Sequence, residues 1–115
     1  MHELGIASSI FEAVQAEARQ RPGARISRVG VRVGEFSSVD PDALKFSFEV
    51  LVKDTAFSTL PLEIELSPLR NRCTSCGQSF VVVDFATACP HCSEPRTECI
   101  GGTELELSYL ELEEP

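Results

Sequence analysis

Histidine is scarce in this sequence, which contains only His2 and His91 among its 115 residues. A catalytic arrangement of the Ser-His-Asp or Cys-His type needs a histidine beside its nucleophile, and neither histidine has a sequence context of that kind. A phosphate loop is also missing, because Gly101-Gly102 is not followed by the lysine, the serine or threonine and the helix of a nucleotide site. The sequence therefore predicts a protein that is not an enzyme.

Long apolar runs are absent as well. No stretch approaches the roughly 20 apolar residues of a membrane-spanning helix. The start of the sequence, Met1-His2-Glu3-Leu4, lacks the basic and then apolar pattern of a secretory signal. We therefore expect a cytoplasmic protein without a membrane partner. In that compartment reduced thiols favour metal ligation by cysteine over disulfides.

Positive charge is sparse beyond the first third of the sequence. The formal net charge is −8, and residues 35–115 carry five basic against fifteen acidic residues. Residues 1–34 have the opposite balance, with five arginines against three glutamates. Phosphate backbones repel an acidic surface, so we expect no nucleic-acid partner.

One dense motif stands out, in which Cys73-Thr-Ser-Cys76-Gly77 is followed by Cys89-Pro-His-Cys92. Twelve residues separate the two Cys-x-x-Cys pairs, a spacing typical of a structural zinc site with four thiolate ligands. Gly77 can supply the positive φ that such a turn often needs. Four sulfurs leave no open position for water, which predicts a structural and not a catalytic metal. Disulfides, a redox dithiol or iron are the alternatives.

His91 and Cys99 lie close to this quartet in the sequence. His91 offers an alternative ligand to one sulfur, but a residue inside such a turn more often faces solvent. Cys99 follows Cys92 by seven residues, and we expect an inert thiol there in preference to a ligand or redox partner.

Apolar periodicity predicts a first helix over residues 5–20, which Pro22-Gly23 ends. Its stripe consists of Ile6, Ile10, Val14 and Ala18.

A second helix is expected to begin at Asp40-Pro41-Asp42 and to run to about Val52. Asp40 can cap free N–H groups, and proline suits the first helical position. Leu44, Phe48 and Leu51 form its main stripe, and Phe46, Val50 and Val52 lie off it. Apolar residues therefore surround more of this helix than one buried face requires. This predicts that a second side of the helix is covered by sheet, by a neighbouring domain or by a partner. Burial within the fold is the favoured explanation.

Alternating residues predict strands at 28–33, 62–66 and 104–113, the last with a change of phase near Tyr109. The strand pattern before the cysteines resumes after them, so the cysteine segment reads as an insertion between two strands of one sheet. We therefore predict an α+β fold. Residues 1–68 and 105–115 would form a domain with a small mixed sheet and two helices, and residues 69–104 an inserted zinc-ribbon domain.

The first three residues offer a second set of metal ligands. Methionine aminopeptidase prefers a small second residue, so Met1 is expected to remain before His2. The set comprises the Met1 amine, the amide and imidazole nitrogens of His2, and the backbone or carboxylate of Glu3. A planar, nitrogen-rich set suits Ni(II) or Cu(II) better than Zn(II). From the residues alone, an early histidine can also be incidental.

Three separated motifs resemble the HypA/HybF family of hydrogenase-maturation proteins, and the resemblance runs nearly end to end. They are Met1-His2-Glu3-Leu4, then Val33-Gly34-Glu35 with residues 39–46 and Phe48, and the paired Cys-x-x-Cys. The family often has a glycine soon after the second cysteine pair, where this sequence has Ser93-Glu94-Pro95. That difference concerns the local turn and not the ligands.

The resemblance implies a nickel metallochaperone that delivers Ni(II) for [NiFe]-hydrogenase assembly, or for urease in some members. By that resemblance His2 is the essential nickel ligand, with Met1 and Glu3 completing the site. The resemblance also implies structural zinc on Cys73, Cys76, Cys89 and Cys92. The implied partners are a HypB-type GTPase and the precursor of the [NiFe]-hydrogenase large subunit, with the chain a monomer or a homodimer.

Two rival functions remain open from the sequence. One is a zinc-ribbon adaptor or regulatory module that binds partners through the acidic C-terminal strand, with His2 incidental. The other is a redox dithiol protein, which is the weaker rival because both cysteine pairs fit a metal site.

Overall fold

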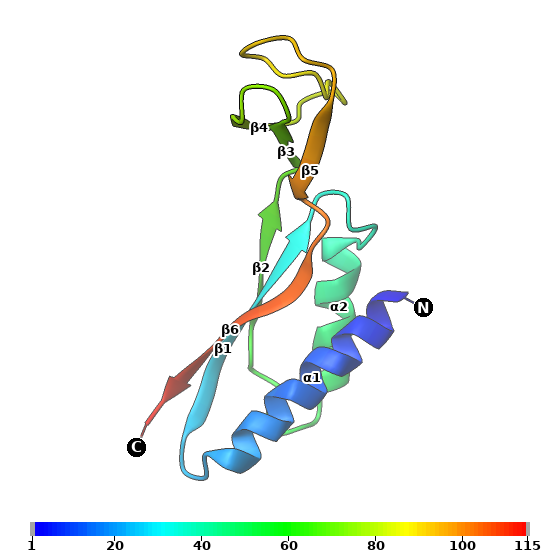
Figure 1. The fold of residues 1–115 in the computed structure, drawn as a ribbon. Coiled ribbons are helices and arrows are strands. Elements are labelled where there is room, and N and C mark those ends of the chain that lie inside the picture. The colour runs from blue at the N-terminus through cyan, green and yellow to red at the C-terminus, as the bar shows by residue number, and fades with distance from the viewer. Residues whose placement is uncertain (1, 115) are drawn as a thin grey trace. The chain divides into compact units, whose positions relative to one another are not determined.

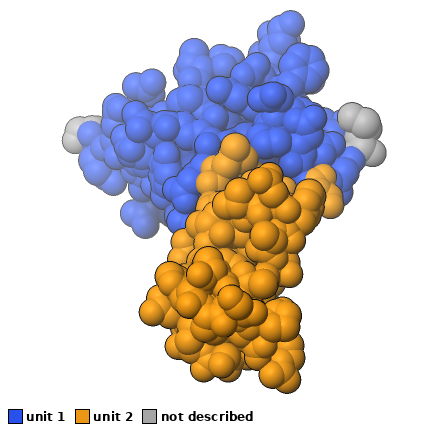
Figure 2. All heavy atoms as spheres, turned by 90° about the horizontal axis from the view of Figure 1, so that it is seen from above, with its two compact units in different colours: residues 1–32, 39–65, 106–115 blue, residues 33–38, 66–105 orange. Residues whose placement is uncertain are grey.

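The computed structural model describes residues 2–114, which form two helices and six strands (Figure 1). In chain order the elements are α1 (His2–Gln20), β1 (Arg25–Gly34), α2 (Pro41–Val52), β2 (Leu62–Ser67), β3 (Arg70–Cys73), β4 (Ser79–Val81), β5 (Thr97–Gly101) and β6 (Leu105–Glu113). The chain divides into two compact units, which Figure 2 shows in different colours. The helical unit comprises residues 1–32, 39–65 and 106–115, and the cysteine unit comprises residues 33–38 and 66–105.

The helix α1 begins at His2, three residues before the predicted start at residue 5. The prediction was late because Ile6 is the first member of the apolar stripe, so the preceding turn carries no periodic signal. Ala7, Ile10 and Val14 form the buried face of the helix. The early start places both His2 and Glu3 in the first turn.

The start of α2 is confirmed: the Asp40 side chain accepts hydrogen bonds from the N–H groups of Asp42 and Ala43. The expected burial of its off-stripe residues is wrong for two of them. Phe46 is 66% exposed and Val50 is 51% exposed, whereas Val52 is buried with the core. Since one three-stranded sheet and one companion helix provide a single layer of apolar contacts, only one side of α2 is covered.

The sheet of the helical unit has the strand order β2-β1-β6. The central strand buries Val29 and Val31, whose side chains alternate with Arg28, Gly30 and Arg32 on the opposite face. The helices contact each other through Phe11, whose ring meets Phe48 of α2 edge to face with centroids 6.3 Å apart. None of the helices in the described residues 2–114 is long and apolar enough to cross a membrane.

On the solvent face of this sheet, Arg28 and Arg32 of β1 each lie between two glutamates of the flanking strands. The pairs are Arg28 with Glu63 (2.7 Å) and Glu111 (3.9 Å), and Arg32 with Glu65 (2.9 Å) and Glu106 (3.1 Å). The Tyr109 ring covers Gly30 between them. Because Glu106 and Tyr109 reach the same face although three residues apart, the predicted change of phase near Tyr109 is confirmed.

The cysteine unit has its own three-stranded sheet, in which β3 pairs antiparallel with both β4 and β5. Its buried apolar cluster is small and consists of Cys73, Phe80, Val82 and Cys89, with Leu69 packed against it. Two of its four buried members are therefore cysteines. The two helices and two small sheets confirm the predicted α+β class, and strands from before and after the cysteine segment share one sheet.

Candidate metal centres

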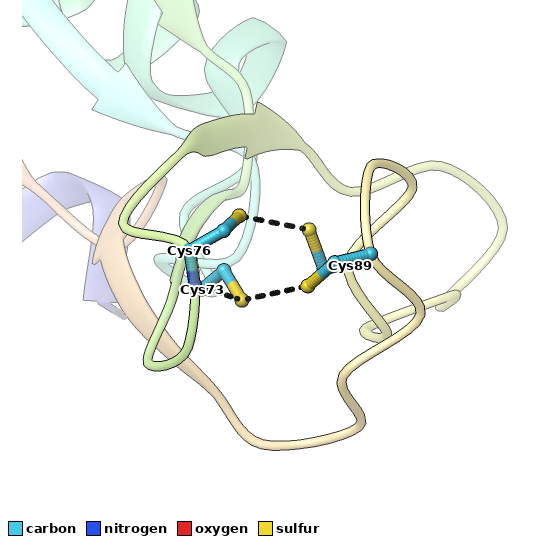
Figure 3. Close-up of side chains that lie close together, drawn as sticks. Cys73, Cys76 and Cys89 are labelled. Carbon is cyan, nitrogen blue, oxygen red and sulfur yellow. Dashed lines mark hydrogen bonds between the residues drawn. The ribbon is translucent and has the colours of Figure 1, made fainter.

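The four cysteines of the two pairs converge, with all four sulfur atoms within 4.8 Å of one another. The Cys73 sulfur lies 3.5 Å from that of Cys92, and the Cys76 sulfur lies 3.7 Å from that of Cys89 (Figure 3). A zinc ion bound tetrahedrally at about 2.3 Å would hold its sulfurs about 3.8 Å apart. The arrangement therefore fits a four-thiolate zinc centre, and all four thiols are free.

The first pair is held by a tight turn after β3. The Gly77 N–H donates to the Cys73 carbonyl at 3.1 Å, and the Cys73 N–H donates to the Gln78 carbonyl at 2.9 Å. Gly77 has φ = 78°, which confirms the predicted positive value. The N–H groups of Ser75 and Cys76 both donate to the Cys73 sulfur at 3.3 Å. The turn thus directs backbone dipoles at one sulfur.

The second pair repeats this turn without a glycine. The Ser93 N–H donates to the Cys89 carbonyl at 2.8 Å, and the Cys89 N–H donates to the Glu94 carbonyl at 2.9 Å. The N–H of His91 donates to the Cys89 sulfur at 3.4 Å. Ser93 takes the position of the expected glycine and adopts φ = 68°. The missing glycine is thus replaced by a serine in the same left-handed conformation.

The sulfurs differ in acidity because each responds to its neighbours. The N–H of Cys76, with that of Ser75, lowers the pKa of Cys73 to about 6 against the effect of burial. The pKa of Cys92 is lowered by the N–H of Glu94. Three effects act against this and raise the pKa to about 12: the hydrogen bond with the Cys73 sulfur, burial, and the sulfurs of Cys89 and Cys76. A divalent cation relieves this repulsion between thiolates, so metal binding must release protons and weaken in acid.

Replacing Ser93 by glycine is expected to stabilise the cysteine unit by about 1 kcal/mol, since an L-residue pays about 1–2 kcal/mol in the left-handed region. Gly77→Ser is the reciprocal control. Within the described part of the chain no atom lies within 4 Å of where its Cβ would be. Only the backbone conformation therefore changes, and a loss of stability of similar size is expected. Urea unfolding of the metal-loaded proteins, followed by the NMR signals of residues 66–105, measures both. Equal stability of Ser93→Gly and the native chain would contradict the strain argument.

The second candidate centre lies in the first turn of α1. The His2 Nδ1 atom is 3.8 Å from the Glu3 Oε2 atom, and the His2 side chain is 62% exposed. The Met1 amine, the third predicted member of this site, lies outside the described residues. Helix starts leave their first N–H groups without intrahelical acceptors, so the amide nitrogens of this turn are not committed to the helix.

Glu3 is held in place by a contact that sequence reasoning missed. Its Oε2 atom accepts a hydrogen bond from the N–H of Asp40 at 3.2 Å. This donor, together with the N–H of Glu3 itself, lowers the pKa of the Glu3 carboxyl below its ordinary value. The glutamate is therefore an anion fixed between the His2 ring and the N-terminus of α2. The contact spans 37 residues, and no local pattern signals it.

His91 and Cys99 do not join the four sulfurs among the described residues. His91 is exposed and contributes its backbone N–H, not its ring, to the second turn. Cys99 lies exposed on β5, where its thiol donates to the Gly101 carbonyl at 3.5 Å.

A closed four-sulfur centre in one unit and a histidine beside an anchored carboxylate in the other define a small metal-handling protein. The comparison with known families makes this specific. The family described as "Hydrogenase/urease nickel incorporation, metallochaperone, hypA" matches residues 1–112, and the chain belongs to this HypA family. The resemblance inferred from the three sequence motifs is confirmed. Membership also places the chain among metallochaperones and not among enzymes.

Individual relatives agree over their whole length. The chain is 36% identical over 114 residues to hydrogenase maturation factor HypA of Pelodictyon phaeoclathratiforme, covering 99% of this chain and 97% of the relative. It is 37% identical over 113 residues to the protein of that name from Geobacter metallireducens, covering 98% and 100%.

Solved structures share the fold. The solution structure of a HypA protein matches with a TM-score of 0.72 and 25% identity, covering 97% of this chain and 96% of that one. The solution structure of the Ni metallochaperone HypA from Helicobacter pylori matches with a TM-score of 0.64 and 23% identity, covering 98% of both chains. The second likeness concerns the fold alone.

Proposed function

We propose that this chain binds Ni(II) at its N-terminus and delivers it for the maturation of [NiFe]-hydrogenase. The observation that carries the proposal is the approach of the His2 imidazole to the Glu3 carboxylate in the first turn of α1. Membership of a family of nickel-incorporation metallochaperones supports nickel as the cargo. The names of the relatives, hydrogenase maturation factors, favour hydrogenase over urease as the destination.

The proposed ligands are the Met1 amine, the amide and imidazole nitrogens of His2, and Glu3. Nitrogen donors of this kind suit the square-planar preference of Ni(II). The positive end of the α1 dipole opposes a bound cation, and the Glu3 carboxylate with a deprotonated amide nitrogen offsets that repulsion. Nickel must also displace protons from these nitrogens. Such a site is open to solvent and readily emptied, as cargo requires.

Zinc on Cys73, Cys76, Cys89 and Cys92 would be structural in this proposal. The four sulfurs complete the tetrahedron, so the ion keeps no position for a substrate or a transferred ligand. The buried positions of Cys73 and Cys89 make the ion part of the core of its unit. Nickel is then the metal that moves, and zinc the one that stays.

The proposed partners are a HypB-type GTPase and the precursor of the [NiFe]-hydrogenase large subunit, met in the cytoplasm by a monomer or homodimer of this chain. The free thiols of all five cysteines are in keeping with a reducing compartment. The acidic net charge of −8 disfavours nucleic acid as a further partner.

Calorimetric titration of the zinc-loaded chain with Ni(II) tests the nickel site. The native chain is expected to show one site of micromolar affinity. His2→Ala, and a variant with a short N-terminal extension that removes the free amine, are each expected to lose about two orders of magnitude in affinity, because each removes a ligand. Zinc content should stay at one ion per chain in both.

The matched control is His91→Ala, which removes the other histidine and leaves the N-terminus intact. Nickel affinity is expected to be unchanged in this variant. If His2→Ala and the extended variant bound nickel as the native chain does, the N-terminal site would be wrong. A loss of nickel binding in His91→Ala alone would place the nickel site in the cysteine unit instead.

A further inference from the structure

The cysteine unit carries an exposed apolar surface that the metal centre does not use. Phe36, Val81, Val83 and Phe85 form this surface, which we name the Phe36–Phe85 surface. Their side chains are 45%, 43%, 61% and 77% exposed. With the less exposed Leu69 and Val82, they line a groove of about 360 Å³. Residues 82–96 connect β4 to β5, both labelled in Figure 1, and Phe85 lies early in this connection.

The turn that presents Phe85 has an energetically unfavourable backbone conformation. Asp84 has φ = 53° and Phe85 has φ = 61°, and the Ala86 N–H closes the turn on the Val83 carbonyl at 3.0 Å. Two successive residues in the left-handed region are the pattern of tight hairpin turns that favour Asn-Gly. A bulky aromatic residue with positive φ is an outlier, and such strain concentrates at functional positions. Folding alone would favour glycine where this chain has Phe85.

The two rings are held in place before any partner arrives. Phe36 meets Phe85 edge to face, with centroids 5.7 Å apart and an angle of 72° between the planes. The Phe36 N–H donates to the Gly102 carbonyl at 2.7 Å, and the Val82 N–H donates to the Leu69 carbonyl at 2.8 Å. Side chains that are already ordered lose little entropy on binding, and aromatic residues, phenylalanine included, are enriched at the cores of protein interfaces. The surface therefore has the properties of a docking site.

Charge selects the kind of partner. Among the described residues 2–114, Glu35 and Asp84 are the only charged ones that line the groove. The Glu35 carboxylate also accepts the Leu69 N–H at 3.3 Å, which fixes it at the rim. A second copy of this chain would bring the same two acidic groups to a symmetric contact and carry a net charge of −8 on each side. A partner with basic residues around its contact segment would complement the negative charges of Glu35 and Asp84.

We propose that the Phe36–Phe85 surface docks a protein partner whose contact segment presents aliphatic side chains flanked by lysine or arginine. The segment fills the groove between the two rings, and its cations lie against Glu35 and Asp84. The cysteine unit thereby recognises a partner in addition to holding its metal. This proposal does not rest on the nickel site, because docking can be measured without nickel.

Titration of the ¹⁵N-labelled full-length chain with two short synthetic peptides tests the surface. Both contain the core Leu-Val-Leu-Val, flanked by two lysines on each side in one peptide and by two glutamates on each side in the other. The lysine peptide is expected to shift the amide signals of residues 35–36, 69 and 81–86 in a saturable manner. The glutamate peptide is expected to bind at least about tenfold more weakly, since like charges oppose it.

Phe85→Gly removes the ring and relieves the positive φ, so the turn keeps its shape. It is expected to weaken binding of the lysine peptide at least about tenfold. The matched control is Phe46→Ala, which removes another largely exposed phenylalanine, from α2 in the other unit, and should leave binding unchanged.

Four outcomes would overturn the proposal. They are the absence of saturable shifts with the lysine peptide, equal affinity for the two peptides, unchanged binding in Phe85→Gly, and sedimentation showing a dimer that Phe85→Gly dissociates. The last result would assign the surface to a second copy of this chain. Loss of binding in Phe85→Gly with retention in Phe46→Ala supports the proposal.

Discussion

Replacing Cys89 by serine is expected to unfold the cysteine unit while α1 and α2 stay helical. Cys89 is both a proposed zinc ligand and a member of the buried cluster, where Cys73, Phe80 and Val82 are its only buried companions in the part of the chain that the structure describes. So small a core supplies little free energy by itself. Structural zinc contributes about 10–16 kcal/mol in small zinc-binding peptides. We expect Cys89→Ser to forfeit most of it, because the variant removes one of the four ligands.

Three measurements check this expectation. Metal analysis should fall from one zinc ion per chain to none, and the NMR signals of residues 69–104 should collapse to random-coil positions. Circular dichroism should retain the helical signal of α1 and α2. Stripping zinc from the native chain with a chelator should give the same result, which also tests the predicted independence of the inserted domain.

Cys99→Ser is the matched control, since it makes the same chemical change at an exposed cysteine of the same unit. This variant should keep its zinc and its dispersed spectrum. If Cys89→Ser unfolded the helices as well, the two units would share one folding core. If it unfolded nothing, the four sulfurs would not be a source of stability.

Gly34→Ala is expected to lower the free energy of unfolding by about 3 kcal/mol or more, because it forces two backbone segments apart. A Cβ at Gly34 would lie 2.4 Å from the carbonyl carbon and oxygen of Gly102. The two segments are joined there by backbone hydrogen bonds of 2.7 Å, from the Gly34 N–H to the Glu104 carbonyl and from the Phe36 N–H to the Gly102 carbonyl. Neither backbone can yield without breaking these bonds.

Gly5→Ala provides the control for this prediction. No atom of the described residues 2–114 lies within 4 Å of the position that its Cβ would take on α1. Alanine there is expected to stabilise the chain by about 0.5–1 kcal/mol through helix propensity. Urea unfolding of both variants gives opposite signs if the close approach at Gly34 is real. A neutral Gly34→Ala would show that the two segments separate easily.

Local chemistry explains which features could be predicted. A Cys-x-x-Cys pair closes its own turn, so its sulfurs converge through hydrogen bonds within six residues, as between Cys73 and Gln78. Asp40 caps α2 through the N–H groups two and three residues ahead. Both features depend on neighbours in the chain, which the sequence displays directly.

Other features depend on groups far apart in the sequence. Phe46 and Val50 are as apolar as Phe48, yet only Phe48 is buried, because the number of layers around α2 is set by the whole unit. The Phe36–Phe85 contact joins residues 49 positions apart. It also depends on a strained turn that no sequence pattern predicted. In the sequence Gly34 looks like an ordinary residue at the end of a strand, and only the structure shows that the backbone of Gly102 lies against it.

The sequence by itself determined the residues of the two proposed metal sites and the α+β class, since donor chemistry and apolar periodicity are local properties. It also indicated the family, through motifs at the start, the middle and the cysteine pairs. Only the tertiary structure placed His2 and Glu3 in a helical turn and tied Glu3 to Asp40. Only it showed which apolar side chains stay exposed, because burial depends on which segments of the chain come together, and the chain order alone does not contain that information.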